Sequence, residues 1–330
     1  MKKKIGIYVK SKYTLFLCLI YFSSIEDNII YFLEEDLKNE INLSKLKVEW
    51  LKNLDKIKGV GEKYKKWKLY NTLLKNLNKI GKIYLQDHIL YSQFFLNNFK
   101  GEIFLLEDGA MNYNYKILEE EYKRKIKKLR INNFIKKVII EKRRKDYKRF
   151  GLSDKIKKIY LTGILPIPNL IKDKVEIINI NEIWSNLSQE AKKEILEVFN
   201  VDIEKFQTFD EEDKKVLLLT QPLSEDEIIT EEEKIKIYRE IIEKQNGRKI
   251  YIKAHPREKT NYGDIFKELN IKIIENGFPI ELLLLLNINF SKVITLFSTG
   301  ALNFKGRSEV EFIGTEKYPK LYERFGKINI

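Results

Sequence analysis

Short apolar runs alternate with longer helical patterns along most of the 330 residues of this chain. Runs rich in Ile, Leu, Tyr and Phe have the length and composition of buried strands. In the first half they cover residues 5–9, 29–33, 82–85, 102–106, 158–161 and 175–180. Helical patterns separate several of them and cover 13–22, 63–79, 88–98 and 186–206. This alternation predicts a parallel sheet with covering helices.

A second strand–helix series follows an acidic stretch near residues 207–214. Its expected strands are 216–220, 248–254, 271–274, 292–298 and 309–314, and its expected helices are 231–245 and 279–287. The chain is long enough for two domains of about 150 residues each. We place the boundary in the acidic stretch, which gives a first domain over 1–212 and a second over 213–330. The sequence therefore predicts an α/β protein with two Rossmann-like domains that face a cleft.

The composition is that of a folded protein without a membrane span. Hydrophobic residues make up 43% of the chain and aromatic residues 12%, which argues against global disorder. The single cysteine, Cys18, cannot form an internal disulfide, so we expect a reducing, cytoplasmic setting. The apolar run 13–22 imitates a signal peptide, but it lacks a small-residue cleavage site and is shorter than the ~20 residues of a membrane helix. We expect a cytoplasmic protein, peripheral at most to the inner face of the cell membrane.

The net charge of +14 is concentrated in one segment. Residues 121–149 hold fourteen Lys or Arg and three acidic residues, with Ile, Leu, Val and Phe interleaved near helical spacing. This pattern predicts a basic amphipathic helix or helix pair inserted in the first domain. It forms either a solvated face or a surface for an anionic partner such as a lipid membrane. Nucleic acid is disfavoured because Phe134 and Tyr147 are the only central aromatics for base stacking.

Polar side chains directly follow four of the expected strands. In an open parallel sheet, this carboxyl edge is where ligands bind. Each motif alone is common loop chemistry, but the four in this order are more specific. They are Glu107-Asp108-Gly109, Thr220-Gln221-Pro222, Lys253-Ala254-His255-Pro256 and Ser298-Thr299-Gly300.

Histidine is rare in this chain, and the two copies are interpreted differently. His255 lies where a strand gives way to a loop, in a Lys-x-His-Pro frame, and its imidazole can act near neutral pH. His88 lies near a strand–helix junction beside Asp87, a plausible capping residue, and we interpret it as structural. Asp108 ends its strand without an evident compensating neighbour, which suits a general base.

Taken together, these motifs resemble the bacterial lipooligosaccharide sialyltransferase family, glycosyltransferase family 52. That family shares an acidic-acidic-Gly motif, a later His-Pro motif and a Ser/Thr pair, matched here by Glu107-Asp108-Gly109, His255-Pro256 and Ser298-Thr299. The opening stretch IYVKSKYTLFLCL and the Pro-x-Glu element ending at Glu281 are also similar. The chain departs from the family in its long basic insert.

The resemblance implies a glycosyltransferase-B-like fold and an inverting, metal-independent sialyltransferase. The donor would be CMP-sialic acid and the acceptor a terminal galactoside of lipooligosaccharide or a related surface glycan. A homodimer is also implied. The alternatives left open are a polysialyltransferase or another CMP-keto-sugar transferase and, from a different class, a basic RNA- or membrane-binding protein.

The resemblance also assigns roles to individual residues. Asp108, the second acid of its motif, would take the proton of the acceptor hydroxyl. His255 would meet the departing phosphate of CMP, and Glu281 would bind the cytidine ribose. The expected donor-binding set is Lys253, Pro256, Glu281, Ser298, Thr299, Gly300, Thr220 and Gln221.

Nothing in the sequence predicts a metal or other cofactor. The chain contains no Asp-x-Asp, one cysteine, and no second histidine at ligand spacing. It also lacks a GxGxxG or Walker-type loop. We therefore expect no metal and no bound cofactor besides the donor substrate.

Overall fold

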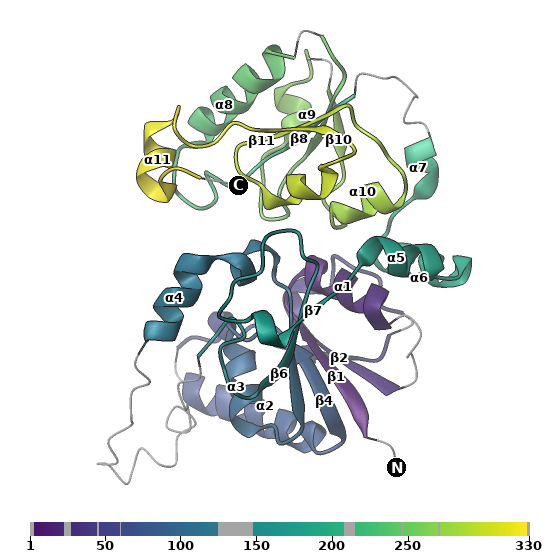
Figure 1. The fold of residues 1–330 in the computed structure, drawn as a ribbon, viewed down its shortest axis with the longest axis vertical. Helices are drawn as coiled ribbons and strands as arrows, with labels where there is room; N and C mark the ends of the chain where they lie inside the picture. Colours follow the sequence, from purple (N-terminus) through teal and green to yellow (C-terminus); the bar gives the residue numbers. More distant parts are fainter. Residues whose placement is uncertain are drawn as a thin grey trace. The chain divides into compact units, whose positions relative to one another are not determined.

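The computed structural model describes residues 3–22, 28–44, 46–59, 61–124, 148–207, 215–245, 247–269 and 271–328. The chain divides into two compact units, Met1–Phe199 and Asn200–Ile330. Each is built on its own parallel sheet with helices packed against it (Figure 1). Two Rossmann-like units are therefore present, as the alternating pattern predicts.

The sheet of unit 1 has seven strands in the order β3-β2-β1-β4-β5-β6-β7. All pairings between them are parallel. The chain builds outward from β1 first on one side and then on the other, so the topological switch point lies between β1 and β4. The strands are β1 (Lys4–Val9), β2 (Ile29–Glu34), β3 (Val48–Leu51), β4 (Ile80–Leu85), β5 (Glu102–Leu106), β6 (Ile156–Leu161) and β7 (Val175–Ile177).

Helices cover both faces of this sheet. Tyr70 of α2 and Phe94 of α3 pack into a core that also contains alternate residues of the strands, such as Ile83 and Leu85. On the other face, Phe22 of α1 contacts Tyr84, which points the opposite way from its strand neighbours. The helices are α1 (Lys12–Phe22), α2 (Glu62–Leu77), α3 (Leu90–Asn98), α4 (Tyr115–Lys123), α5 (Ile180–Asn186) and α6 (Gln189–Val198), with short 3-10 turns at Glu35–Leu37, Leu54–Lys56, Lys172–Lys174 and η4 (Gly109–Tyr113).

The sheet of unit 2 has five parallel strands in the order β10-β9-β8-β11-β12. By the same argument, its switch point lies between β8 and β11. The strands are β8 (Val216–Leu219), β9 (Ile250–Lys253), β10 (Ile271–Ile274), β11 (Lys292–Thr295) and β12 (Glu309–Phe312). The helices are α7 (Ile203–Gln207), α8 (Glu231–Glu243), α9 (Tyr262–Ile265), α10 (Glu281–Leu285), α11 (Pro319–Phe325) and the 3-10 helix η8 (Thr299–Phe304).

The observed elements match most of the expected ones. The short helices α9 and α11 were not expected, and three further differences concern β3, the passage 186–206 and the boundary between the units. Strand β3 was not expected, because Val48–Leu51 is an edge strand with only one fully buried residue. The helical passage 186–206 is broken into parts of α5, α6 and α7, with Asn200 between α6 and α7 at φ +53°. The compact units divide before Asn200 rather than in the acidic stretch, most of which (208–214) lies outside the described residues.

Most of the basic segment 121–149 also lies outside the described residues, which end at Arg124 and resume at Lys148. Helix α4 ends at Lys123, just inside that segment. The expected basic helical insert therefore stays a prediction. Among the helices that the structure describes, none has the length and hydropathy needed to cross a bilayer.

Candidate active site

Glu107 anchors the carboxyl end of β5. Its side chain is buried and accepts hydrogen bonds from the hydroxyls of Tyr13 at 2.5 Å and Tyr113 at 2.6 Å, and from the N–H of Thr162 at 2.6 Å. Burial raises the pKa of this carboxyl, although the three donors oppose the shift. Because its two oxygens accept these hydrogen bonds, Glu107 connects α1, η4 and the residue that follows β6.

Asp108, the next residue, pairs with His88. Nε2 of His88 lies 3.0 Å from Oδ2 of Asp108, and the Asp108 side chain is 28% exposed. The His88 ring stacks on Phe150 with centroids 5.4 Å apart. The expectation that Asp108 has no compensating neighbour is therefore wrong. The interpretation of His88 as structural stays a prediction, but its ring lies beside a candidate catalytic residue.

The pairing follows from the order of the strands. His88 follows β4 closely and Asp108 follows β5 closely, and these two strands are neighbours in the sheet. Gly109 at φ +56° turns the chain immediately after Asp108, and the Asp108 N–H donates to Oδ1 of Asn112 at 2.9 Å. His88 could have been recognised from the sequence as a candidate site residue, because it follows an expected strand closely, as the acidic motif does.

Asp87 is not a helix cap. It is completely buried, and its two carboxylate oxygens accept the N–H groups of Phe150 and Gly151, each at 2.7 Å. Burial raises its pKa to about 6 despite these bonds. Asp87 therefore fixes the Phe150 backbone, and with it the ring against which His88 stacks.

A buried polar network joins the strand ends at the switch point of unit 1. The amide of Gln86 donates to Oγ1 of Thr14 at 2.6 Å, and Oγ1 of Thr14 lies 3.0 Å from Oγ of Ser11. Thr14 Oγ1 is also 3.4 Å from the carbonyl oxygen of Glu107. These side chains fix the loops after β1, β4 and β5 against one another beside the Asp108–His88 pair.

In unit 2, the His255 imidazole has a defined protonation site. Its Nδ1 accepts the N–H of Arg257 at 3.2 Å, and the His255 N–H donates to Oε1 of Glu258 at 2.7 Å. Burial, followed by the nearby Arg257 charge, lowers the pKa of the imidazole. The ring is therefore mainly neutral at pH 7, with its proton on Nε2, and it can donate a hydrogen bond from that atom.

Two expected donor contacts of unit 2 are engaged inside the protein. Lys253 is buried, with its ammonium 2.7 Å from the carbonyl oxygen of Glu275 and 3.8 Å above the Phe278 ring. The hydroxyl of buried Thr220 donates to Oε1 of Glu258 at 2.5 Å. These groups shape the strand ends, whereas Pro256 is exposed and Gln221 half-buried. This geometry therefore does not support the expectation that Lys253 and Thr220 contact the donor.

Glu281 and the Ser298-Thr299-Gly300 turn are brought together by Asn303. Its amide nitrogen donates to Oε1 of Glu281 at 2.9 Å and to the carbonyl oxygen of Gly300 at 3.2 Å. A Cβ at Gly300 would lie 3.2 Å from Ile280, so the absence of a side chain allows this close approach. Asn303 was not among the residues expected from the sequence, although it follows the Ser-Thr-Gly motif by one turn of η8.

Thr295 joins this turn to the switch point of unit 2. Its hydroxyl donates to the carbonyl oxygen of Leu219 on β8 at 2.9 Å, and it accepts the N–H of Ser298 at 3.0 Å. The loops after β8 and β11 thus meet where a doubly wound sheet binds its ligand. The candidate residues form two groups: Glu107, Asp108 and His88 in unit 1, and His255, Glu281, Ser298 and Thr299 in unit 2.

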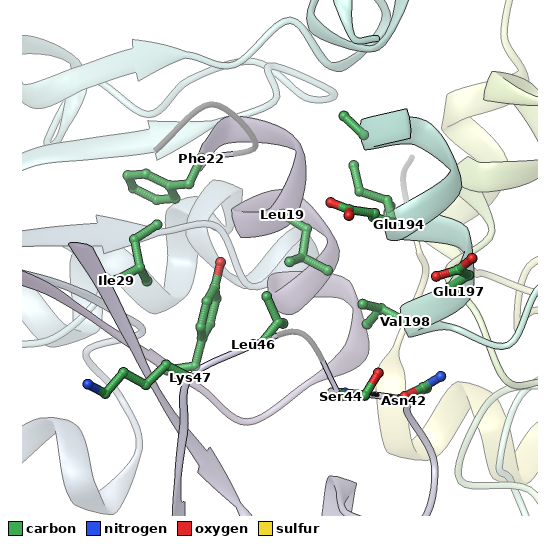
Figure 2. Close-up of a pocket in the computed structure, with 13 residues that line it drawn as sticks. Leu19, Phe22, Ile29, Asn42, Ser44, Leu46, Lys47, Glu194, Glu197 and Val198 are labelled. Atoms are coloured by element: carbon green, nitrogen blue, oxygen red, sulfur yellow. Dashed lines mark hydrogen bonds between the residues drawn. The ribbon is translucent and has the colours of Figure 1, made fainter. Parts of the chain in front are cut away.

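A separate pocket in unit 1 contains none of these residues. Leu19 and Phe22 of α1, Ile29 of β2, and Glu194 and Glu197 of α6 are among its lining residues (Figure 2). It adjoins the amino-terminal end of β2, whereas the candidate residues follow the carboxyl ends of strands. Across the described ranges, no group of three or more His, Cys, Asp or Glu side chains could hold a metal ion.

Solved structures share this fold at low sequence identity. An alpha/beta-galactoside alpha-2,3-sialyltransferase from Photobacterium phosphoreum has a TM-score of 0.62 and 16% identity, covering 94% of this chain and 90% of its own. A 2,6-sialyltransferase from Photobacterium sp. JT-ISH-224, solved with CMP and lactose, has a TM-score of 0.61 and 12% identity, covering 98% and 76%. The UDP-GlcNAc 2-epimerase of Methanocaldococcus jannaschii has a TM-score of 0.54 and 14% identity, covering 99% and 93%. The fold is the two-domain, Rossmann-like GT-B fold.

Sequence comparison identifies the family. An uncharacterized protein from Haemophilus influenzae is 40% identical over 246 residues, which are 74% of this chain and 72% of its own length. The model of glycosyltransferase family 52 matches residues 19–315, a range that contains all of the candidate residues. This chain belongs to glycosyltransferase family 52.

Proposed function

We propose that this protein is an inverting, metal-independent sialyltransferase that uses CMP-sialic acid. The proposed acceptor is a terminal galactoside of lipooligosaccharide or a related surface glycan. Membership of family 52 and the fold shared with sialyltransferases support sialyl transfer in general. The observation that carries the more specific proposal is the Asp108–His88 pair, because it supplies an oriented, solvent-accessible carboxylate at the carboxyl edge of the sheet.

In the proposed reaction, an acceptor hydroxyl attacks the anomeric carbon of the sialyl group as its proton passes to Asp108. The bond between that carbon and the phosphate oxygen breaks, and its electron pair leaves with CMP. Attack from the face opposite the leaving group inverts the anomeric configuration. His88 holds one oxygen of the Asp108 carboxylate, which leaves the other to accept the proton.

His255 has a complementary role at the leaving group. Negative charge builds on the phosphate as CMP departs, and a neutral imidazole with its proton on Nε2 stabilises that charge by a hydrogen bond. Ser298 and Thr299 are proposed to donate to the same phosphate, and Glu281, oriented by Asn303, to accept from the cytidine ribose. This assignment requires no metal ion.

The test is a transfer assay with CMP-sialic acid and a panel of galactosides, with products identified by mass and linkage. UDP-GlcNAc serves as the alternative sugar nucleotide, because epimerases share the fold. Sialylated galactoside from the parent, absent with Asp108→Asn, supports the proposal. A parent that binds CMP in saturation-transfer NMR yet sialylates no galactoside would contradict it, and so would one that binds RNA but not CMP.

The setting of the reaction is also a proposal. An acceptor anchored in lipid would place the enzyme at the inner face of the cell membrane, where the basic segment 121–149 would contact anionic lipid. A homodimer is proposed from the family resemblance.

A further inference from the structure

A buried lysine of helix α8 lies among three carboxylates that also contact the loop carrying His255. Lys234 of α8 has no solvent exposure, so its ammonium depends on protein partners. Its Nζ lies 3.0 Å from Oε2 of Glu225, 3.0 Å from Oε2 of Glu231 and 3.9 Å from Oε2 of Glu258. One cation is thus shared among three carboxylates.

Each of these carboxylates also accepts a hydrogen bond from a different point of the loop 255–260, to which Glu258 itself belongs. Glu258 and Glu231 use the oxygen that is farther from Lys234, whereas Oε1 of Glu225 accepts from both Lys234 and the loop. Glu258 accepts the N–H of His255 at 2.7 Å. Glu225 accepts the N–H of Lys259 at 2.7 Å. Glu231 accepts the hydroxyl of Thr260 at 2.6 Å. The loop is therefore attached at its start and its end to acceptors that converge on one ammonium group.

The attachment extends to the neighbouring strand and helix. Oε1 of Glu258 also accepts the Thr220 hydroxyl at the end of β8, and Oε2 accepts the hydroxyl of Tyr262 at 2.6 Å. The pKa of Glu225 is held at about 2: burial raises it, but the Lys259 N–H and the Lys234 ammonium more than offset burial. These charge-assisted bonds are the stronger class of hydrogen bond and fix geometry well.

Stability alone is a weak reason for such a cluster. Replacing a buried ion cluster by well-packed apolar residues is often neutral or stabilising, whereas removing one member leaves an uncompensated charge. The loop that this cluster holds contains the Arg257 N–H, which lies between the attachments at His255 and Lys259 and donates to Nδ1 of His255. That bond sets the proton of the neutral imidazole on Nε2. The Arg257 guanidinium also pairs with Asp226 outside the cluster.

We propose that Lys234 is a positioning residue for His255, acting through Glu225, Glu231 and Glu258 to fix the loop and the Nε2–H tautomer. The proposal rests on the function proposed above, in which Nε2–H meets the leaving phosphate. The proposal gives a role to Lys234, which from the sequence of helix α8 alone would be interpreted as a solvent-exposed lysine.

The direct test is the tautomer of His255, read from ¹H–¹⁵N NMR of the imidazoles. The chain has two histidines, so His88→Phe and His255→Ala assign the signals. In the parent, His255 should be a single Nε2–H tautomer. In Lys234→Met, it should become a mixture of tautomers, and kcat should fall by roughly 10- to 100-fold, as expected for a misplaced reacting group. The KM for CMP-sialic acid should change much less.

Lys320→Gln is the matched control, because it removes an exposed lysine that pairs with Glu233 of the same helix at 2.7 Å. It should change neither the tautomer nor kcat. If Lys234→Met does not fold, Glu225→Ala is the second variant. Of the three loop attachments it releases only that of Lys259, and although it also removes the bonds of Glu225 to Lys234 and Ser224, it leaves two carboxylates near Lys234, so the lysine charge stays balanced. This variant should shift the tautomer in the same direction, with a smaller loss of kcat.

A folded Lys234→Met or Glu225→Ala in which His255 stays the Nε2–H tautomer overturns the proposal. Full turnover with an altered tautomer overturns its link to catalysis. The tautomer is read without substrate, so a parent that transfers no sialic acid refutes the proposed function while leaving the positioning result to be judged by NMR.

Discussion

His88 Nε2 lies 3.0 Å from Asp108 Oδ2, and the two residues come from the loops that follow neighbouring strands. An imidazole nitrogen this close to one carboxylate oxygen restricts the rotamer of the carboxylate without occupying its other oxygen. This differs from Glu107, one residue earlier, whose two oxygens accept several donors. The adjacent acidic residues therefore have distinct environments: the Glu107 side chain is buried and fully hydrogen-bonded, and the Asp108 side chain is partly exposed to solvent.

Asp108→Asn and Glu107→Gln should affect different properties. Asn at 108 still accepts from His88 but cannot take a proton, so transfer should fall by about 10²-fold or more while CMP binding and thermal stability persist. Gln at 107 cannot satisfy the same donors, so unfolding should become easier by roughly 1–3 kcal/mol. Kinetics and thermal unfolding of both variants check this. Loss of transfer in a stable Glu107→Gln, with Asp108→Asn active, would assign the base to Glu107.

His88→Phe should lower kcat without unfolding the protein. The aromatic ring keeps the stacking on Phe150 but removes the donor to Asp108, so the carboxylate loses its orientation. We expect a fall of roughly 10- to 100-fold in kcat with little change in the KM of the donor. His88→Gln, which retains a donor at the end of the side chain, should recover part of the activity. Equal activity in the parent and His88→Phe would remove His88 from the mechanism.

The lowered pKa of His255 predicts a specific pH dependence of stability. The folded protein binds a proton at this site less readily than the unfolded chain does. The contribution of His255 is therefore fully present above the unfolded pKa of about 6.5 and is lost as the pH falls through the lower folded value. The parent should lose stability relative to His255→Gln as the pH is lowered from 7 toward 5. Urea unfolding across this interval measures the difference, and a constant difference would contradict the direction of the shift.

Asn303→Ala should weaken binding of CMP. Asn303 holds Glu281 against the turn at Gly300, so its loss frees a carboxylate that is proposed to bind the ribose. A rise of about 5- to 10-fold in the Kd for CMP corresponds to one lost orienting hydrogen bond. Asn303→Asp should weaken binding further, because it places a second carboxylate beside Glu281. Calorimetric titration with CMP checks both variants, and unchanged affinity in both would remove Glu281 from the donor site.

The local pattern of the chain predicted the strands well because most of them are continuous apolar runs buried on both faces. It missed β3, a four-residue edge strand in which three residues are half-buried and Glu49 interrupts the apolar run. The acidic motif and His255 were visible because each ends an apolar run. The Asp108–His88 contact depends on β4 and β5 being neighbours, which no local pattern specifies. Lys234 has the spacing of an ordinary helix lysine, and only the tertiary structure surrounds it with three carboxylates.

The charge of segment 121–149 predicts that activity depends on how the acceptor is presented. Each Lys or Arg near an anionic bilayer contributes about 1 kcal/mol of binding, and this contribution declines with salt. Changing Lys136, Lys137, Lys142, Arg143 and Arg144 to Gln should therefore weaken binding to vesicles that contain anionic lipid. Transfer to a lipid-linked acceptor should fall with it. Transfer to soluble lactose should hardly change, because a free sugar needs no tether.

The matched control changes five basic residues elsewhere, the exposed lysines Lys52, Lys65, Lys68, Lys75 and Lys100. Equal weakening in both variants would attribute vesicle binding to the net charge of +14 rather than to this segment. Equal loss on lipid-linked and soluble acceptors would place the segment in folding or in the active site. Vesicle sedimentation at low and high salt, with both acceptors assayed in parallel, separates these outcomes. Selective loss on the lipid-linked acceptor, confined to the variant of segment 121–149, is the result that membrane recruitment requires.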